Sequence, residues 1–151
     1  MLILRFSLGA RSFAIRAAHV REILPVVRFR PVPLAPEIVA GDFLLRGVPC
    51  PVIDLRRWLD GEPARIDLAT RLLLLDWTGH GATGPLAVIG ERVRDAVEVD
   101  PGSISPPAIG RTEDQVIGGE VVIDGEIVTV VDPAALMTGE LAELCYARAA
   151  G

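Results

Sequence analysis

The chain has 151 residues, of which 50% are hydrophobic, a size that fits one ordinary domain or two very small ones. Its net charge is −5 and all 15 cationic residues are arginines, which argues against a nucleic-acid partner, because phosphates require a clustered basic face. No apolar run approaches the roughly 20 residues of a membrane span, and the first residues lack the order of a secretory signal, so we expect a cytoplasmic protein that does not insert into membranes.

Strands are predicted along most of the first half of the chain. The apolar runs 2–8 and 12–18 flank the sequence Gly-Ala-Arg, a short connection that is typical of a β-hairpin. The run 19–29 carries apolar and charged residues on both faces, which predicts a half-exposed strand. The prolines between 31 and 36 end regular structure, since each lacks an N–H donor and favours extended geometry in the residue before it.

Residues 44–59, with the sequence LLRGVPCPVIDLRRWL, combine a turn, a strand and a short helix. Gly47 permits a tight reversal of the chain. Pro49 and Pro51 remove two backbone donors from the strand that follows, which favours an edge position or a bulge. Asp54 is the predicted N-cap of a helix of one or two turns.

The second half of the chain is also predicted to be rich in strands, over 71–77, 85–93, 95–100, 115–124 and 126–132. Asp124-Gly125 between the last two is the strongest hairpin signal in the chain. Asp132 and Pro133 begin a short capped helix, and the apolar period of 139–150 predicts a C-terminal helix. Short strands with turns about every 8–12 residues predict an all-β fold of the antiparallel barrel or sandwich kind.

A weak internal echo links the two halves. Residues 47–59 and 125–137 both run from a glycine through an apolar strand to an aspartate and a short amphipathic helix. The echo predicts two similar small barrels, each ending in a capped turn. It places the boundary between them near residues 60–70, where the sequence DGEPARIDLAT interrupts the apolar pattern.

The residues that carry enzyme or metal chemistry are few and poorly spaced. His19 and His80 form no pattern with a nucleophile, and Cys50 and Cys145 lack a second ligand at metal-binding spacing. The aspartates of the two capped turns are open to two interpretations, as paired acid–base carboxylates or as helix caps, and capping is the simpler one. We therefore expect no catalytic residues, no metal and no cofactor, with both cysteines reduced.

Motifs in order along the chain resemble the CheW-like domain family. The run AGDFLLRGVPCPVIDLRRWL at 40–59 is similar to the family's signature, in which a glycine and an apolar pair precede Asn-Leu-Arg-Gly, an apolar strand and Pro-Val-Ile-Asp-Leu. Residues 6–24 and 32–41 look like the family's opening strands and proline-bracketed connection, and 97–107 and 116–137 resemble its second half. The resemblance implies one domain over 1–151, made of two intertwined five-stranded SH3-like barrels with short helices at strand exits. It leaves open whether the N-terminal strand joins the second barrel.

Members of this family are adaptors without an active site, and the resemblance implies the same role for this chain. The implied partners are the regulatory domain of a CheA-type histidine kinase and the cytoplasmic tip of a methyl-accepting chemoreceptor. Carried over by position, Val20, Glu22 and Arg46 match the receptor-binding groove. Arg46 has a second interpretation, as a residue that braces its own domain, because arginine pairs are as often structural as functional.

The kinase-facing residues are predicted from the local pattern. Leu55 and Trp58 lie at helical spacing beside Arg56 and Arg57, and tryptophan and arginine are enriched where interface energy concentrates. Trp58 has a second interpretation, as a plug that covers the end of its own barrel.

Departures from the family pattern keep other functions open. Leu44 replaces the family's asparagine, Asp42 replaces an apolar residue, Pro49 is an additional proline, and Gly90-Glu91 stands where Val-Asp is typical. One alternative is a divergent CheW-like module in a non-flagellar chemosensory pathway, such as one that controls pili. Another is a barrel that binds extended peptides of a different partner by strand addition. A small enzyme is the third, and it requires a cleft with perturbed titratable groups.

Overall fold

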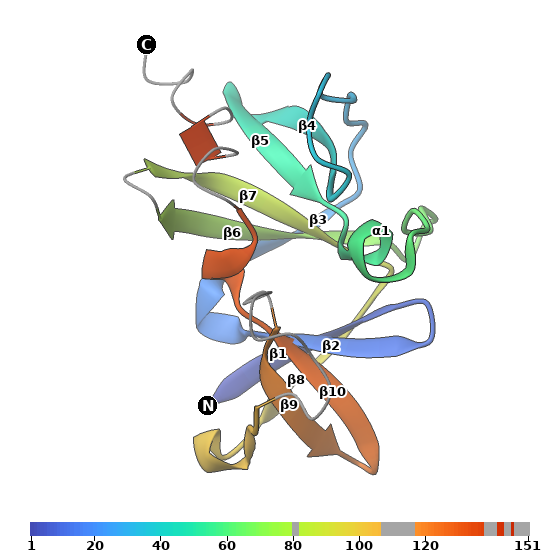
Figure 1. Cartoon of the computed structure of the whole chain (residues 1–151), viewed down its shortest axis with the longest axis vertical. Helices are drawn as coiled ribbons and strands as arrows, with labels where there is room; N and C mark the ends of the chain where they lie inside the picture. The colour runs from blue at the N-terminus through green and yellow to red at the C-terminus, as the bar shows by residue number, and fades with distance from the viewer. Residues whose placement is uncertain (80–81, 107–116, 138–141, 144–145, 147–151) are drawn as a thin grey trace.

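The computed structural model describes residues 1–79, 82–106, 117–137, 142, 143 and 146. Within these residues, two five-stranded sheets stacked along the long axis form the body of the molecule (Figure 1). The prediction of an all-β fold with two five-stranded barrels is therefore confirmed. The predicted C-terminal helix over 139–150 falls largely outside the described residues, and it stays a prediction.

The strands are distributed between the sheets as follows. The first sheet has the order β8-β1-β2-β10-β9, with β1 (Leu2–Leu8), β2 (Arg11–Arg16), β8 (Arg92–Glu98), β9 (Ile117–Ile123) and β10 (Glu126–Val131). The second sheet has the order β3-β6-β7-β5-β4, with β3 (Val20–Pro25), β4 (Val39–Leu45), β5 (Val48–Ile53), β6 (Arg71–Gly79) and β7 (Ala82–Gly90). Short helices in the described ranges include α1 (Leu55–Asp60) and the 3-10 turns η1 (Ala17–His19), η2 (Pro101–Ser103) and η3 (Pro133–Ala135). Short helices thus follow β5 and β10, as predicted.

The two sheets repeat one topology. In the first sheet the hairpin β1–β2 pairs with β8 on one side and with β10 on the other, and β10 runs parallel to β2. In the second sheet the hairpin β6–β7 pairs with β3 and with β5, and β5 runs parallel to β7. The echo between 47–59 and 125–137 therefore corresponds to the equivalent strands β5 and β10 and the short helices after them.

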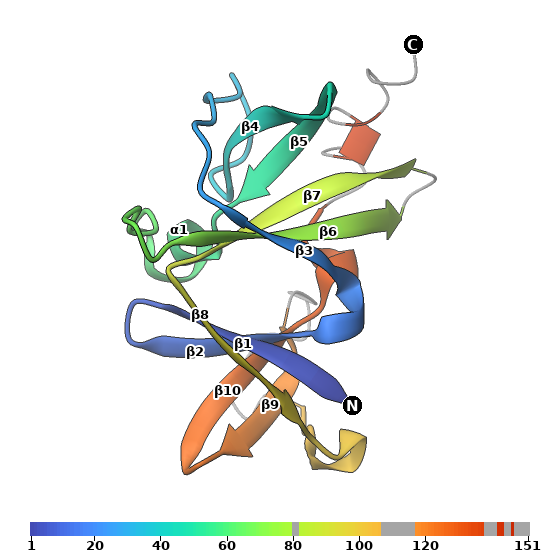
Figure 2. The same cartoon turned by 180° about the vertical axis from the view of Figure 1, so that it is seen from behind.

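The chain changes sheet at two places, both outside the segment 60–70. It passes from the first sheet to the second through η1, and it returns at Glu91, between β7 and β8. In Figure 2 the olive strand β8 descends from the upper sheet and runs beside β1 in the lower one. The boundary between the two sheets therefore does not lie at 60–70, where the echo predicts it. β6 and β7 follow that segment but pair with strands that precede it.

Both hairpins that the sequence predicts most directly are present. β1 and β2 pair across a short turn, and Asp124 and Gly125 form the two-residue turn of β9–β10 with φ angles of 51° and 78°. The β4–β5 turn is similar, with φ angles of 49° at Arg46 and 82° at Gly47. Two successive left-handed residues match the right-handed twist of the strands. Arginine is uncommon in the left-handed conformation that Arg46 adopts.

β5 as a whole is an internal strand, but its prolines lie in the half that pairs with one neighbour only, so the predicted edge position is correct for the segment that carries them. The sheet order places β5 between β4 and β7. The register pairs Pro49 with Leu44 and Pro51 with Asp42, which after a two-residue turn are the pairs whose N–H positions face away from the partner strand. On that other side, β7 pairs with β5 only from Val52 onward. The prolines are tolerated because the first half of β5 has one neighbour.

Asp54 caps α1, as predicted. Its carboxylate accepts hydrogen bonds from the backbone N–H groups of Arg56 and Arg57 at 3.0 and 3.3 Å, and from that of Ala64 at 2.8 Å. In the equivalent position of the other barrel, Asp132 accepts a hydrogen bond from a backbone N–H of η3 at 3.1 Å. The two carboxylates therefore serve as separate caps rather than as an acid–base pair.

Replacing Asp54 by alanine is expected to lower the free energy of unfolding by about 1–2 kcal/mol, because the change removes the N-cap and the acceptor of the Ala64 N–H. Urea denaturation followed by circular dichroism measures the loss. Asp100→Ala is the control, since the exposed Asp100 caps only the three-residue η2. Equal losses in the two variants would contradict this role of Asp54.

Strands β1 and β2 form a wall between two hydrophobic cores. Phe6, Leu8 and Phe13 belong to the larger core, which extends through the second sheet. Ile3 and Ala14 belong to the smaller core of the first barrel. This alternation has the period of two expected of strands buried on both faces. The rings of Phe6 and Phe13, which lie opposite one another on β1 and β2, stack with centroids 5.7 Å apart. The larger core contains buried residues of both sheets, so it is continuous between the two barrels.

Candidate protein-binding site

The predicted receptor-binding residues come from opposite edges of the second sheet. Val20 and Glu22 lie on β3, and Arg46 lies in the β4–β5 turn. Nη2 of Arg46 is 3.7 Å from Oε2 of Glu22, and 70% and 42% of these two side chains are exposed. Val20 is half-buried and packs against the larger core. The fold thus brings Glu22 and Arg46 together at the surface, while Val20 anchors the start of β3.

A residue that sequence reasoning missed, Arg21, joins this group because of a β-bulge. The pairing of β3 with β6 matches Val20 to Leu75 and Glu22 to Leu74, so Arg21 is the extra residue on β3. Strict alternation places neighbouring residues on opposite faces, but a bulge redirects a side chain. A change of register of this kind has no signature in the local sequence.

A pocket of about 180 Å³ lies beside the Glu22–Arg46 ion pair. Its lining consists of Arg21, Leu45, Arg46, Val48 and Pro85, and we call it the Arg46 pocket. Three apolar side chains and two guanidinium groups therefore share a small concave surface. Apolar contact area combined with arginine is the composition found where protein interfaces concentrate their binding energy.

Two departures from the family pattern lie close to this turn. Asp42 accepts a hydrogen bond from Nε of Arg30 at 2.8 Å, and the backbones of the two residues exchange hydrogen bonds of 2.9 Å. These contacts between Arg30 and Asp42 connect the segment after β3 to β4, so they link the two edges of the second sheet. Leu44, in place of the family's asparagine, is largely exposed next to the turn.

The structure corrects the predicted kinase-facing pair on α1. Leu55 is only 1% exposed and belongs to the larger core, so it is not a surface residue. Trp58 is half-buried and packs against the same core. Their helical spacing, which suggested a shared outer face, instead places both on the inner face of α1. The plug interpretation of Trp58 accounts for its packing, and part of the side chain remains accessible.

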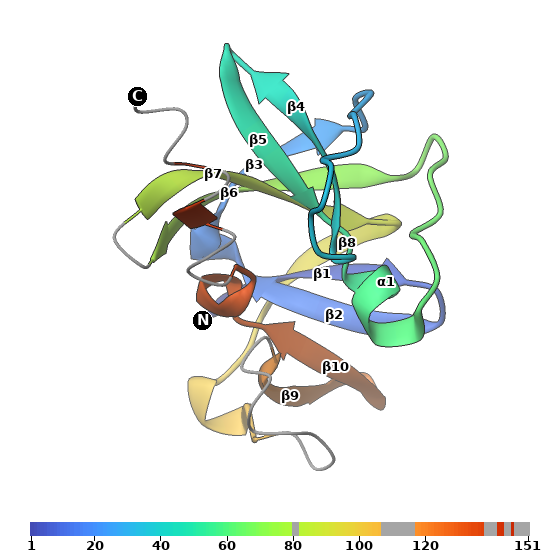
Figure 3. The same cartoon turned by 45° about the horizontal axis from the view of Figure 1, so that its top comes forward.

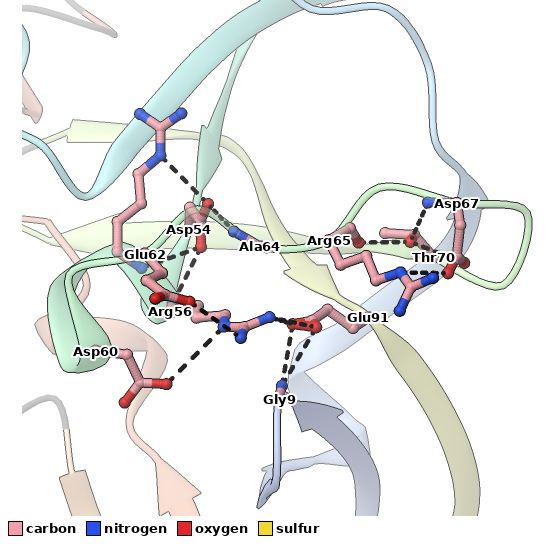
Figure 4. Close-up of polar contacts among 11 residues, drawn as sticks. Gly9, Asp54, Arg56, Asp60, Glu62, Ala64, Arg65, Asp67, Thr70 and Glu91 are labelled. Carbon is pink, nitrogen blue, oxygen red and sulfur yellow. Dashed lines mark hydrogen bonds and ion pairs between the residues drawn. The ribbon is translucent and has the colours of Figure 1, made fainter.

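Arg56 on α1 lies at the centre of an ion-pair cluster that joins the two barrels (Figure 4). Nη1 of Arg56 lies 2.5 and 3.0 Å from the two carboxylate oxygens of the buried Glu91, which also accept hydrogen bonds from the Gly9 N–H at 3.0 and 3.2 Å. Arg11 on β2 lies 3.5 Å from Asp60 at the end of α1. The hydrogen bond to Glu91 raises the pKa of Arg56 above its ordinary value. Figure 3 shows α1 beside the tip of the β1–β2 hairpin.

Glu91 was noted in the sequence only as a departure from the family pattern. The structure gives it a role, because it occupies the point where the chain returns to the first sheet and bonds to α1 and to the β1–β2 turn. Its backbone N–H donates to the carbonyl of Ser7 at 3.0 Å. The sequence next to Glu91 gives no signal of these partners, because they belong to segments that are distant in the sequence.

Groups with reactive or metal-binding potential are scarce in the described part of the chain. Among the described residues, no group of three or more His, Cys, Asp or Glu side chains is arranged to hold a metal ion. Burial raises the pKa of the Cys50 thiol to about 12, which keeps it protonated at neutral pH. His80 and Cys145 lie outside the described residues. No helix in the described ranges is long and apolar enough to cross a membrane.

Comparison with known proteins identifies the family. Residues 2–140 match the model of the CheW-like domain. The chain belongs to the CheW-like domain family. Its fold is that of the crystal structure of the scaffolding protein TtCheW from Thermoanaerobacter tengcongensis, with a TM-score of 0.79 over 91% of this chain and 87% of that one at 24% identity. The predicted resemblance and its SH3-like barrels are thus confirmed.

Protein FrzA of Myxococcus xanthus is a relative of this CheW-like chain by sequence. The two are 30% identical over 107 residues, which is 70% of this chain. The same alignment spans 63% of FrzA, so part of that protein has no counterpart in the alignment.

Proposed function

We propose that this CheW-like protein is a cytoplasmic adaptor, without enzyme activity, in chemotaxis-type signalling. It couples a methyl-accepting chemoreceptor to a CheA-type histidine kinase by binding both proteins. The observation that carries the proposal is the CheW-like match over residues 2–140. The surface supports it, since the exposed chemistry is that of a binding site: a concave pocket of apolar and guanidinium groups.

The receptor tip binds at the Arg46 pocket, with Glu22 and Arg46 at the surface and Val20 holding the start of β3. The bracing interpretation of Arg46 is weak, because its described partner is the exposed Glu22 at 3.7 Å. Exposed ion pairs contribute about 0–1 kcal/mol to stability. Arg46 is therefore free to serve a partner at little cost to the fold.

Arg46→Ala is expected to lower the affinity for the chemoreceptor tip by about tenfold while it leaves the thermal midpoint within a few degrees, because an exposed side chain contributes little to folding. Calorimetric titration and thermal denaturation measure the two effects. Arg94→Ala, which removes an exposed arginine of the other sheet, is the control. If Arg46→Ala unfolds the protein instead, the bracing interpretation is correct.

The kinase regulatory domain binds near the exposed edge of Trp58 on α1. With Trp77 replaced by phenylalanine, Trp58 is the single fluorescent tryptophan. We expect an emission that is already partly blue-shifted in the free protein, because Trp58 packs on the core, and that shifts further when the kinase domain is added. An emission that the kinase domain leaves unchanged removes Trp58 from the interface.

A divergent CheW-like module of a non-flagellar chemosensory pathway has the same two kinds of partner, whereas a barrel that binds extended peptides of another partner is the second candidate. The exposed Leu44, where the family has asparagine, favours it because it changes the chemistry next to the pocket. A pull-down with the purified protein separates the candidates. Recovery of a kinase and a receptor supports the adaptor, and recovery of neither supports the second candidate.

A further inference from the structure

Arg21 and Arg46 both line the Arg46 pocket, and each already forms an ion pair with a carboxylate. Arg46 pairs with Glu22, and Nη1 of Arg21 lies 3.2 Å from Oδ1 of Asp76. We propose that the pocket binds a glutamate side chain of the partner. Arg21 and Arg46 both bind the carboxylate of that glutamate. The proposal rests on the proposed function for the identity of that partner, the chemoreceptor tip.

The lining of the pocket matches a side chain with an apolar stem and a carboxylate end. Leu45, Val48 and Pro85 supply apolar contact, and the two arginines supply planar donor groups. Arginine is suited to carboxylates because its N–H groups match their two oxygens. The volume of about 180 Å³ accommodates one side chain rather than a helix, so a single residue of the partner enters.

The present partners of the two arginines are exchangeable. Between 42% and 70% of each of the four side chains is exposed, and the distances of 3.2 and 3.7 Å are at the long end for charged pairs. Exposed pairs of this kind contribute little to stability. A partner carboxylate that arrives on an apolar surface excludes water from the pocket, and there the same charges attract one another more strongly.

The backbone fixes both arginines in place before a partner arrives. Arg21 is the bulged residue of β3, and Arg46 occupies a left-handed position in a two-residue turn. Asp76, the competitor for Arg21, lies opposite the lining residue Pro85 in the β6–β7 hairpin. Arg21 therefore extends from a paired strand, where positions are more precise than on a loop, and Arg46 extends from the tight turn between two paired strands.

The first test removes one charge at a time on the adaptor. The probe is the purified cytoplasmic tip of the chemoreceptor from the same organism, titrated by calorimetry. Arg21→Gln should weaken binding by about tenfold, and Asp76→Asn should strengthen it severalfold, since it frees Arg21 from its competitor. Arg94→Gln, with an exposed ion pair to Glu126 at 3.5 Å, is the matched control and should bind normally.

The second test identifies the partner residue. Each exposed glutamate of the tip is changed to glutamine, and each variant is titrated with the wild-type adaptor and with Arg21→Gln. One tip variant should lose about tenfold with the wild type and little more with Arg21→Gln, because the two changes remove the same contact. Normal tip binding by Arg21→Gln overturns this inference alone. Absence of tip binding by the wild type overturns the adaptor proposal, and the inference with it.

Discussion

Phe6→Ala is expected to lower the free energy of unfolding by about 3–5 kcal/mol, because Phe6 is fully buried and its loss leaves a cavity. The ring stacks on Phe13 at the level where the two barrels share one core. The variant should therefore destabilise both barrels together. Urea denaturation, followed by circular dichroism for the whole chain and by the fluorescence of Trp58 and Trp77 for the second barrel, measures this.

The control for this prediction is Ile127→Ala, which removes an exposed side chain of the first barrel and should change stability by less than about 0.5 kcal/mol. If Phe6→Ala gave two separate transitions, with tryptophan fluorescence reporting an unchanged second barrel, the continuous core would be refuted.

Glu91→Ala is expected to lower the free energy of unfolding by about 2–3 kcal/mol, because it removes a buried carboxylate that accepts from a backbone N–H and from a guanidinium group. Glu91→Gln should cost less, since its amide oxygen still accepts from the Gly9 N–H. Chemical denaturation of the three proteins gives the order wild type, Glu91→Gln, Glu91→Ala.

A matched control uses the same arginine. Glu62 lies 3.5 Å from Arg56 but 72% of its side chain is exposed, so Glu62→Ala should have little effect. Equal losses for Glu62→Ala and Glu91→Ala would show that the surface charge around Arg56, rather than the buried bond between the barrels, is what matters.

The features that local sequence predicted correctly are those that one stretch of chain determines. The Asp124-Gly125 turn forms because both residues tolerate a positive φ. Asp54 caps α1 because its side chain reaches the N–H groups that follow it. The echo of strand, aspartate and short helix identified two similar barrels for the same reason, since each copy is a local unit.

The features that were missed depend on contacts between distant segments. The return of the chain to the first sheet at Glu91, and not near 60–70, follows from the pairing of β6 and β7 with earlier strands. Leu55 was assigned to the surface because its spacing with Trp58 is compatible with either face of a short helix, and only packing decides which face is buried. The ion pair between Asp42 and Arg30 was also missed. Arg30 belongs to the irregular segment after β3, which folds back beside β4.

The candidate site was predicted in part for the same reason. The resemblance supplied Val20, Glu22 and Arg46 by position, and the structure places Glu22 beside Arg46. Arg21 could not be predicted from the sequence pattern, because a β-bulge places it at the pocket.

The most direct test of the adaptor proposal is sedimentation velocity of the protein mixed with a CheA-type regulatory domain and a chemoreceptor tip from the same organism. An adaptor binds both at once, so a complex that contains all three proteins should sediment faster than any pair. Separate sedimentation of the three components at concentrations on the order of 100 µM would contradict the account. An adaptor has to bind each partner with a dissociation constant of about 100 µM or lower.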